Sequence, residues 1–161
     1  MKSLSRPQPS VEFVAVDPSA GEAQECLAQY FAELAARFDG GFDREKDAPP
    51  PLTDFTSPAG CLLLAHLDGK PVACGALRTL EPGVGEIKRM WVSSGARGLG
   101  IGRSILQRLE LEAQRRKLHT VRLDTNKALP EALRLYRSAG YREIARFNDN
   151  PYAHHWFEKT L

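Results

Sequence analysis

The sequence contains few cysteines, and their spacing does not suit a metal site or a disulfide framework. Only three are present in the 161 residues, at Cys26, Cys61 and Cys74, and no two of them have the C-x-x-C spacing. Each has apolar neighbours in the sequence, so we interpret all three as small hydrophobic side chains of the core. We therefore expect neither a bound metal nor a catalytic thiol.

The chain also lacks a charge excess and a long hydrophobic run. Its formal net charge is +2, which gives no basis for a nucleic acid or a membrane surface as partner. No apolar stretch approaches the roughly 18 residues that a membrane-spanning helix needs. Residues 1–7 are polar and lack the apolar centre of a signal peptide. We expect a cytoplasmic protein that binds neither nucleic acid nor membrane.

The length and composition indicate a single domain with a short arm in front of it. Residues 1–10 hold two prolines and three serines, which is typical of a flexible segment. The remaining residues, 11–161, are numerous enough to bury a core of their own. We expect one domain over 11–161.

Hydrophobic periodicity predicts an alternation of strands and helices. A helix starting at Ser19, with Glu22 as its capping-box partner, is expected to end before Gly40. Asp68-Gly69 separates two apolar runs and predicts a type I′ hairpin. Residues 42–58 are expected to form a loop, with a short helical turn at 52–55. The strands are expected at 11–16, 61–67, 71–77, 84–92, 119–125, 141–147 and 154–161, and the helices at 19–38, 101–117 and 129–139.

The connections between these elements predict a mixed sheet. The hairpin makes its two strands antiparallel, whereas the strand–helix–strand unit from 84 to 125 implies a parallel pair. The fold class is therefore α/β (α+β), with helices that flank the sheet.

A glycine-rich loop joins the strand 84–92 to the following helix. Backbone N–H groups at a helix N-terminus bind anions, and glycines allow a phosphate to approach the backbone closely. The loop is not a dinucleotide fingerprint, because Arg103 stands where the third glycine is needed, and its spacing does not match a P-loop. An ordinary strand-to-helix turn is the alternative to a phosphate site.

Three features together resemble the GNAT superfamily of acyl-coenzyme A-dependent N-acyltransferases. The pattern [QR]-x-x-G-x-[GA] is present as Arg97, Gly100 and Gly102, directly after a strand. Asn126 follows the fifth strand, and residues 135–141 match L-Y-x-x-x-G-[FY]. The order of elements over 11–161 is also that of the superfamily.

The resemblance implies a sheet of about seven strands, mostly antiparallel, in which strands four and five splay apart around the pantetheine arm of acetyl-coenzyme A. Asn126 is expected to hydrogen-bond this arm, and Tyr136 is expected near the sulfur. The backbone of the fourth strand and the glycine loop would hold the rest of the coenzyme through Met90, Trp91, Val92, Arg97, Gly98, Leu99, Gly100, Ile101, Gly102 and Arg103. No metal is expected.

Acetyl transfer to an amine at pH 7 needs a base for the nucleophile and a proton for the departing thiolate. Glu86 is the candidate base, because Glu86, Lys88 and Met90 are expected on one face of their strand. A structural ion pair between Glu86 and Lys88 is the alternative. The resemblance makes Tyr136 the candidate acid, and a simple packing role is its alternative.

The acceptor is expected to be a primary amine of a small molecule, such as an amino acid. Acetylation of a protein or peptide and a non-catalytic module that binds coenzyme A are the alternatives. The protein is expected to be a monomer or a homodimer. Candidate acceptor-binding residues come from the first helix, the fourth strand and the 148–156 segment, and they are Tyr30, Phe31, Arg37, Lys88, Asn150, Tyr152 and His154.

Overall fold

The computed structural model describes residues 10–47 and 49–161, so the predicted arm lies outside the described residues except for Ser10. Ten helices and strands follow one another in the predicted order, with short 3-10 turns at Leu52–Phe55 and Ser94–Ala96. They are β1 (Val11–Val16), α1 (Gly21–Arg37), β2 (Gly60–Leu67), β3 (Lys70–Glu81), β4 (Val84–Val92), α2 (Ile101–Arg115), β5 (Thr120–Thr125), α3 (Pro130–Ser138), β6 (Arg142–Ile144) and β7 (His155–Thr160).

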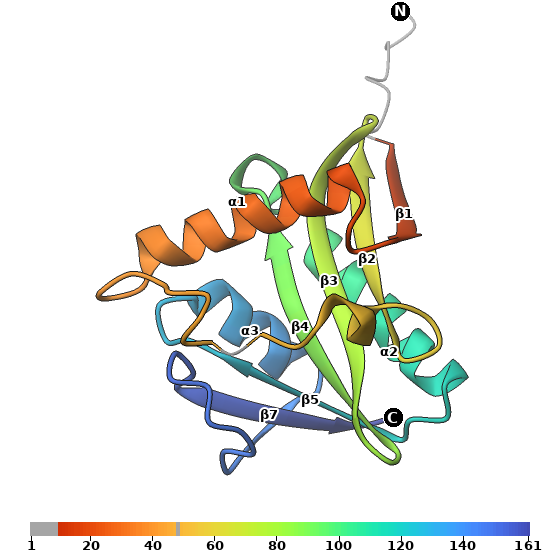
Figure 1. Cartoon of the computed structure of the whole chain (residues 1–161), viewed down its shortest axis with the longest axis vertical. Helices are drawn as coiled ribbons and strands as arrows, with labels where there is room; N and C mark the ends of the chain where they lie inside the picture. The colour runs from red at the N-terminus through yellow and green to blue at the C-terminus, as the bar shows by residue number, and fades with distance from the viewer. Residues whose placement is uncertain (1–9, 48) are drawn as a thin grey trace, which may run out of the picture.

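The strands form one seven-stranded sheet in the order β1-β2-β3-β4-β5-β7-β6. Neighbouring strands are antiparallel except for β4 and β5, which are parallel. This pair is short, because only residues 84–86 of β4 pair with residues 120–122 of β5. Beyond Glu86 the two strands diverge, and Figure 1 shows the opening between them. The expected mixed, mostly antiparallel sheet with splayed fourth and fifth strands is confirmed.

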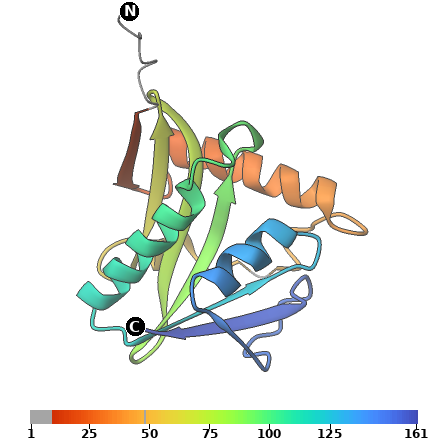
Figure 2. The same cartoon turned by 180° about the vertical axis from the view of Figure 1, so that it is seen from behind.

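The helices cover the two faces of the sheet, as the front and back views show (Figures 1 and 2). Successive side chains of a strand point to opposite faces, so β2 contributes to two cores. Leu62 and Leu64 pack with α1, whereas Leu63 packs with Ile105 and Leu109 of α2. All three cysteines are buried, as expected.

Two local predictions can be compared with backbone geometry. Asp68 and Gly69 both have positive φ, at 51° and 82°, which confirms the type I′ turn of the hairpin. The predicted capping box is wrong, because α1 begins at Gly21 and its N-cap makes no side-chain hydrogen bond. The Ser19 hydroxyl instead donates to Asp17.

A β-bulge in β4 changes which side chains share a face. Ala76 pairs with Lys88 and Cys74 pairs with Trp91, so two residues of β4 oppose Gly75 alone. Arg89 at the bulge has a φ of 59°. An extra residue interrupts the alternation of side chains, so the expectation that Met90 shares the face of Glu86 and Lys88 is wrong.

The two residues of the bulge point in opposite directions. Met90 packs in the core beneath α2, and its sulfur lies 2.7 Å from where a Cβ on Gly75 would be. The Arg89 guanidinium lies over the ring of Phe31, on the α1 side. The bulge therefore directs a cation toward α1 and turns Met90 away from it.

Candidate active site

A cavity of about 440 Å³ lies beside the end of β4. Its walls come from the end of β4, the glycine loop, the start of α2, one side of α3 and part of α1. The residues from β4, the loop and α2 are Met90, Trp91, Val92, Ala96, Arg97, Gly98, Gly100, Ile101, Gly102 and Arg103. Of the ten residues predicted for this part of the coenzyme site, nine thus line one cavity, and Leu99 does not.

The glycine loop has the geometry of an anion site. Gly98 and Gly100 have φ values of 84° and 75°, and no atom lies within 4 Å of a Cβ built on either. Over residues 10–47 and 49–161, no acceptor pairs with the N–H groups of Ile101, Gly102 and Arg103. These donors and the positive end of the α2 dipole point toward the loop. The residues present therefore fit a pyrophosphate group.

Arginines add positive charge around this loop. Arg97, Arg103 and Arg134 all line the cavity. Arg97 donates to the Val92 carbonyl at 3.2 Å and pairs with Glu33 of α1, while Arg103 donates to the Ser138 hydroxyl of α3. These contacts hold the cations at the rim of the cavity, where an anionic ligand would meet them.

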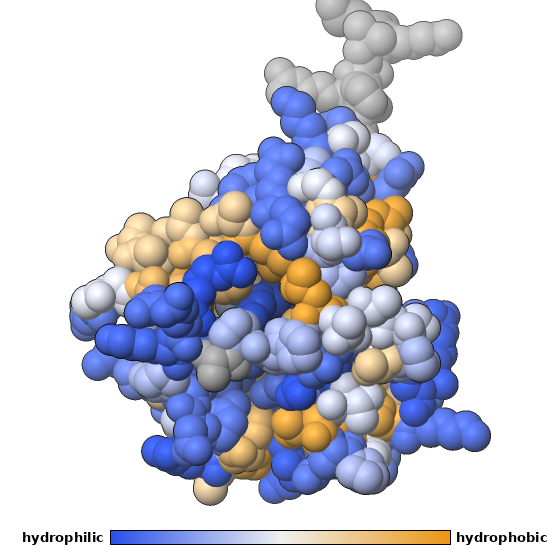
Figure 3. Space-filling model, viewed as in Figure 1, coloured by the Kyte–Doolittle hydropathy of each residue, from blue (hydrophilic) through white to orange (hydrophobic). Residues whose placement is uncertain are grey.

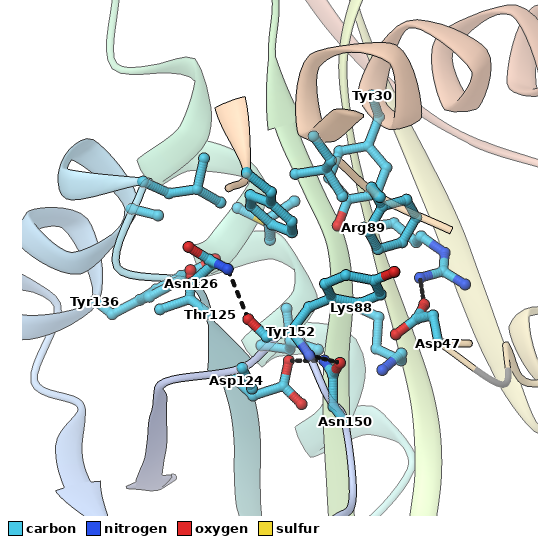
Figure 4. A pocket seen from close by; sticks show the side chains of 18 residues that line it. Tyr30, Asp47, Lys88, Arg89, Asp124, Thr125, Asn126, Tyr136, Asn150 and Tyr152 are labelled. Atoms are coloured by element: carbon cyan, nitrogen blue, oxygen red, sulfur yellow. Dashed lines mark hydrogen bonds and ion pairs between the residues drawn. The ribbon is translucent and has the colours of Figure 1, made fainter. Parts of the chain in front are cut away.

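A second, smaller cavity of about 70 Å³ adjoins the first. Figure 4 shows its polar wall, with Tyr30 of α1 above and Asp124 of β5 below. On the outer surface the same side of the molecule is hollowed below α1 (Figure 3). The two cavities share the lining residues Tyr30, Leu34, Met90, Leu129, Ala132 and Tyr136.

Tyr136 lies at the junction of the two cavities. Its side chain comes from α3, which packs it against Tyr141 and Phe157. Burial raises the pKa of its hydroxyl well above the usual range, so the proton is retained at neutral pH. Among the described residues this hydroxyl has no hydrogen-bond partner, and it is therefore a donor available to a ligand.

Asn126 lines the smaller cavity, but both ends of its amide bind within the protein. Its Nδ2 donates to the Tyr152 carbonyl at 2.7 Å, and its Oδ1 accepts from the Ala128 N–H at 2.8 Å. These bonds connect the end of β5 to the segment that precedes β7. Contact with the coenzyme arm stays a prediction for this residue.

Glu86, the candidate base, is buried beside the smaller cavity and does not line it. Its carboxylate lies 3.0 Å from Arg78 and 3.9 Å from the Lys88 ammonium. The carboxylates that do line this cavity are Asp47 and Asp124, which the sequence analysis did not select. The position of Asp124, two residues before Asn126 at the end of a strand, was the available signal.

The predicted acceptor residues divide into two groups. Tyr30, Lys88, Asn150 and Tyr152 line the smaller cavity together. The other three, Phe31, Arg37 and His154, do not, and each has a contact that explains its position. Phe31 stacks on Phe42, Arg37 forms an ion pair with Glu131, and the exposed His154 accepts the Lys127 N–H.

The segment after α1 contributes to the smaller cavity. Phe42 and Asp47 both line it, and the Asp47 carboxylate lies 3.6 Å from the Arg89 guanidinium. The Asp43 N–H donates to the Tyr152 hydroxyl at 2.8 Å. Part of the predicted loop is therefore a wall of the cavity.

In the described part of the chain, no group of three or more His, Cys, Asp or Glu side chains is placed to hold a metal ion. None of its helices combines the length and the apolar character needed to cross a membrane.

Comparison with known proteins gives the family. The model of the "Acetyltransferase (GNAT) family" matches residues 27–141, which is more than half of the chain. The chain belongs to the GNAT acetyltransferase family. A relative named IAA acetyltransferase, from Azospirillum brasilense, is 33% identical over 125 residues, which is 77% of this chain and 82% of the relative.

Solved structures of GNAT proteins agree with this assignment. A GNAT-family acetyltransferase from Staphylococcus aureus superposes with a TM-score of 0.81 at 20% identity, over 94% of this chain and 99% of that one. A protein described as a putative acyl-CoA N-acyltransferase from Klebsiella pneumoniae gives 0.74 at 26% identity, over 94% and 97%. This GNAT protein is thus an N-acetyltransferase, and its family implies acetyl-coenzyme A as co-substrate.

Proposed function

We propose that this enzyme transfers an acetyl group from acetyl-coenzyme A to a primary amine of a small molecule, by direct attack in a ternary complex. The observation that carries the proposal is the junction of two cavities at Tyr136. One cavity has an anion-binding loop and room for a long ligand. The other is small and lined by polar side chains. Two substrates bound in them would meet at the Tyr136 hydroxyl.

The larger cavity suits the coenzyme. The N–H groups at the start of α2 would bind the pyrophosphate, with Arg97 and Arg103 beside it. The backbone of Met90, Trp91 and Val92 borders the cavity and would lie along the pantetheine arm. Backbone N–H groups there would polarise the thioester carbonyl, as in an oxyanion hole.

The smaller cavity suits a small acceptor rather than a folded protein surface. Its volume is about 70 Å³, and the segment that contains Phe42 and Asp47 forms one wall. The relative named IAA acetyltransferase supports an acceptor of this size class. The compound called IAA in that relative's printed name is therefore tested beside the amines.

Acid and base catalysis would come from opposite sides of the junction. The protonated Tyr136 hydroxyl would supply the proton that the departing thiolate needs. Glu86 is connected to the acceptor cavity through Asn148, whose Nδ2 lies 3.5 Å from Glu86 and 2.6 Å from Asp124. We keep Glu86 as a candidate base that would act through a water molecule.

The test is an acceptor screen in which free thiol is measured with a chromogenic disulfide. The panel contains amino acids, polyamines, aminoglycosides, IAA and short peptides, each with acetyl-coenzyme A. We expect thiol release that depends on a small amine and an acetylated product of the correct mass. Activity on peptides alone would instead support protein acetylation. Coenzyme binding without any amine-dependent thiol release would support a non-catalytic module.

A further inference from the structure

Asp124 is a carboxylate in the acceptor cavity and has no cationic partner among residues 10–47 and 49–161. The two neighbouring carboxylates are paired, Glu86 with Arg78 and Asp47 with Arg89. In the described part of the chain, no Lys, Arg or His nitrogen lies within 4.0 Å of the Asp124 carboxylate. Partly buried charges are normally paired, so this one lacks a counter-charge that a ligand can supply.

Two amides hold the Asp124 carboxylate in place. Asn148 Nδ2 donates to one oxygen at 2.6 Å, and Asn150 Nδ2 donates to the other at 3.2 Å (Figure 4 shows the Asn150 contact). Each oxygen of an ionised carboxylate can accept more than one hydrogen bond. Both oxygens are therefore oriented while keeping capacity for a further donor from the cavity.

The direction of both amides follows from their other contacts. Asn148 Oδ1 accepts from the Trp156 indole N–H at 2.9 Å, and an indole nitrogen can only donate. Asn150 Oδ1 accepts from the Tyr152 backbone N–H at 3.0 Å, which is likewise only a donor. The amino groups must therefore point toward Asp124, with one N–H donated to each oxygen of its carboxylate.

The Asp124 charge also acts on the two hydroxyls at the junction of the cavities. Burial raises the pKa of both Tyr30 and Tyr136, and the negative charge of Asp124 raises each further. The carboxylate is therefore close enough to the reaction site to influence the groups around it. Glu86 does not contribute in this way to either tyrosine.

We infer that Asp124 binds the amino group of the acceptor as an ammonium ion, so that the enzyme selects alkylamines over amines that are neutral at pH 7. This inference rests on the proposed function, because it concerns the acceptor of the same reaction. The acceptor ammonium supplies the counter-charge that none of the described residues provides to Asp124.

The protons balance through the base and Tyr136. The ammonium, held by Asp124, gives one proton to the base, for which Glu86 acting through a water molecule is the candidate, and becomes a neutral nucleophile. Its nitrogen forms the C–N bond to the acetyl carbon, and the C–S bond breaks. Tyr136 gives its proton to the thiolate and takes the second nitrogen proton. The product amide is uncharged and leaves Asp124, and the base releases its proton to solvent.

The test compares two acceptors of matched size in the wild-type enzyme and in Asp124→Asn. One is the best alkylamine from the screen, and the other is an aromatic amine, which is neutral at pH 7. We expect kcat/KM for the alkylamine to fall by about 10- to 100-fold in the variant, the loss of a hydrogen bond to a charged group. The value for the aromatic amine should stay within about threefold, since that acceptor carries no ammonium charge for Asp124 to pair with.

The matched control is Asp149→Asn, which removes an exposed carboxylate of the same segment that pairs with Arg146 at 2.8 Å. It should leave both kcat/KM values unchanged. Coenzyme affinity, measured by calorimetry, should be the same in all three proteins. An unchanged alkylamine rate in Asp124→Asn, or equal losses for both acceptors, would overturn the inference.

Two further measurements keep the inference testable. If Asp124→Asn does not fold, Asn150→Ala removes one of the two amides, and it should raise KM for the alkylamine alone. If the wild-type enzyme acetylates no amine, the proposed function fails, but calorimetric titration of an alkylamine into the coenzyme-bound protein still tests Asp124. Equal alkylamine affinity in the wild type and the variant would then refute its role.

Discussion

Replacing Tyr136 by Phe removes one hydroxyl and leaves the packing of its ring intact. Tyr136 lines both cavities, and its hydroxyl has no hydrogen-bond partner among the described residues. Its removal should change the free energy of unfolding by less than about 0.5 kcal/mol, because no hydrogen bond within the protein is lost. The effect on turnover should be much larger.

The size of the turnover effect follows from the role proposed for this hydroxyl. Loss of a general acid typically lowers a rate by a factor of about 10² to 10⁴. We therefore expect kcat to fall at least about 100-fold in Tyr136→Phe, which corresponds to about 2.7 kcal/mol of activation free energy. The dissociation constant of acetyl-coenzyme A should stay within about twofold, since the anion-binding loop is not altered.

Tyr141→Phe is a matched control five residues along the chain. Its hydroxyl donates to Glu110 at 2.8 Å, and it lines neither cavity. Loss of this bond to a charged group should cost about 1.5–3 kcal/mol of stability, or roughly 5 °C in Tm, while kcat is unchanged. The assays are thiol release under saturating substrates and thermal unfolding. An unchanged kcat in Tyr136→Phe would refute its role as the acid.

Three other predictions concern the core. Gly60→Ala should lower the free energy of unfolding by about 3 kcal/mol, because the new Cβ would lie 2.0 Å from the Leu77 carbonyl oxygen. Gly95→Ala is the control: its Cβ would meet no atom within 4 Å, so the free energy of unfolding should not fall. Denaturant titration measures both values. Burial raises the pKa of Cys26 and Cys61 to about 11, so few thiolates are present in the folded protein at pH 8. A disulfide reagent at this pH should therefore label these cysteines in the unfolded protein and leave them unlabelled in the folded protein. Because folding favours the neutral thiols, their stabilisation is present below the unfolded pKa of about 8.5, and Tm should fall as the pH rises from about 9 to 11.

The sequence was sufficient to predict those structural features that depend only on residues next to one another in the chain. The apolar stripe of α2 and the glycines before it predict a helix that starts at an open loop, and the structure has that loop at Gly98 and Gly100. Asp68-Gly69 predicts its turn because few residue pairs accept positive φ at both positions. These features are local, so no distant contact could change them.

Two features of the structure depended on residues far apart in the sequence: the face of the sheet to which a side chain points, and the partner with which a charged side chain pairs. The bulge at Arg89 arises from the pairing of β4 with β3, and it reverses the direction of Met90. Arg37 was a candidate for acceptor binding, but it pairs with Glu131, 94 residues away. Alternation in a strand cannot show either effect, because register and ion pairs form only when the chain is folded.

The proposed coenzyme site and the proposed acceptor cavity differ in how far apart their residues lie in the sequence. A helix N-terminus and its glycines form one continuous segment, so the sequence alone predicts a place that suits a pyrophosphate. The proposed acceptor cavity combines α1, β4, β5 and the segment before β7, and the charge of Asp124 is positioned by amides 24 and 26 residues further along the chain. Only the tertiary structure decided that Asp124 lines the cavity with no cationic partner among the described residues, because its neighbours come from distant segments.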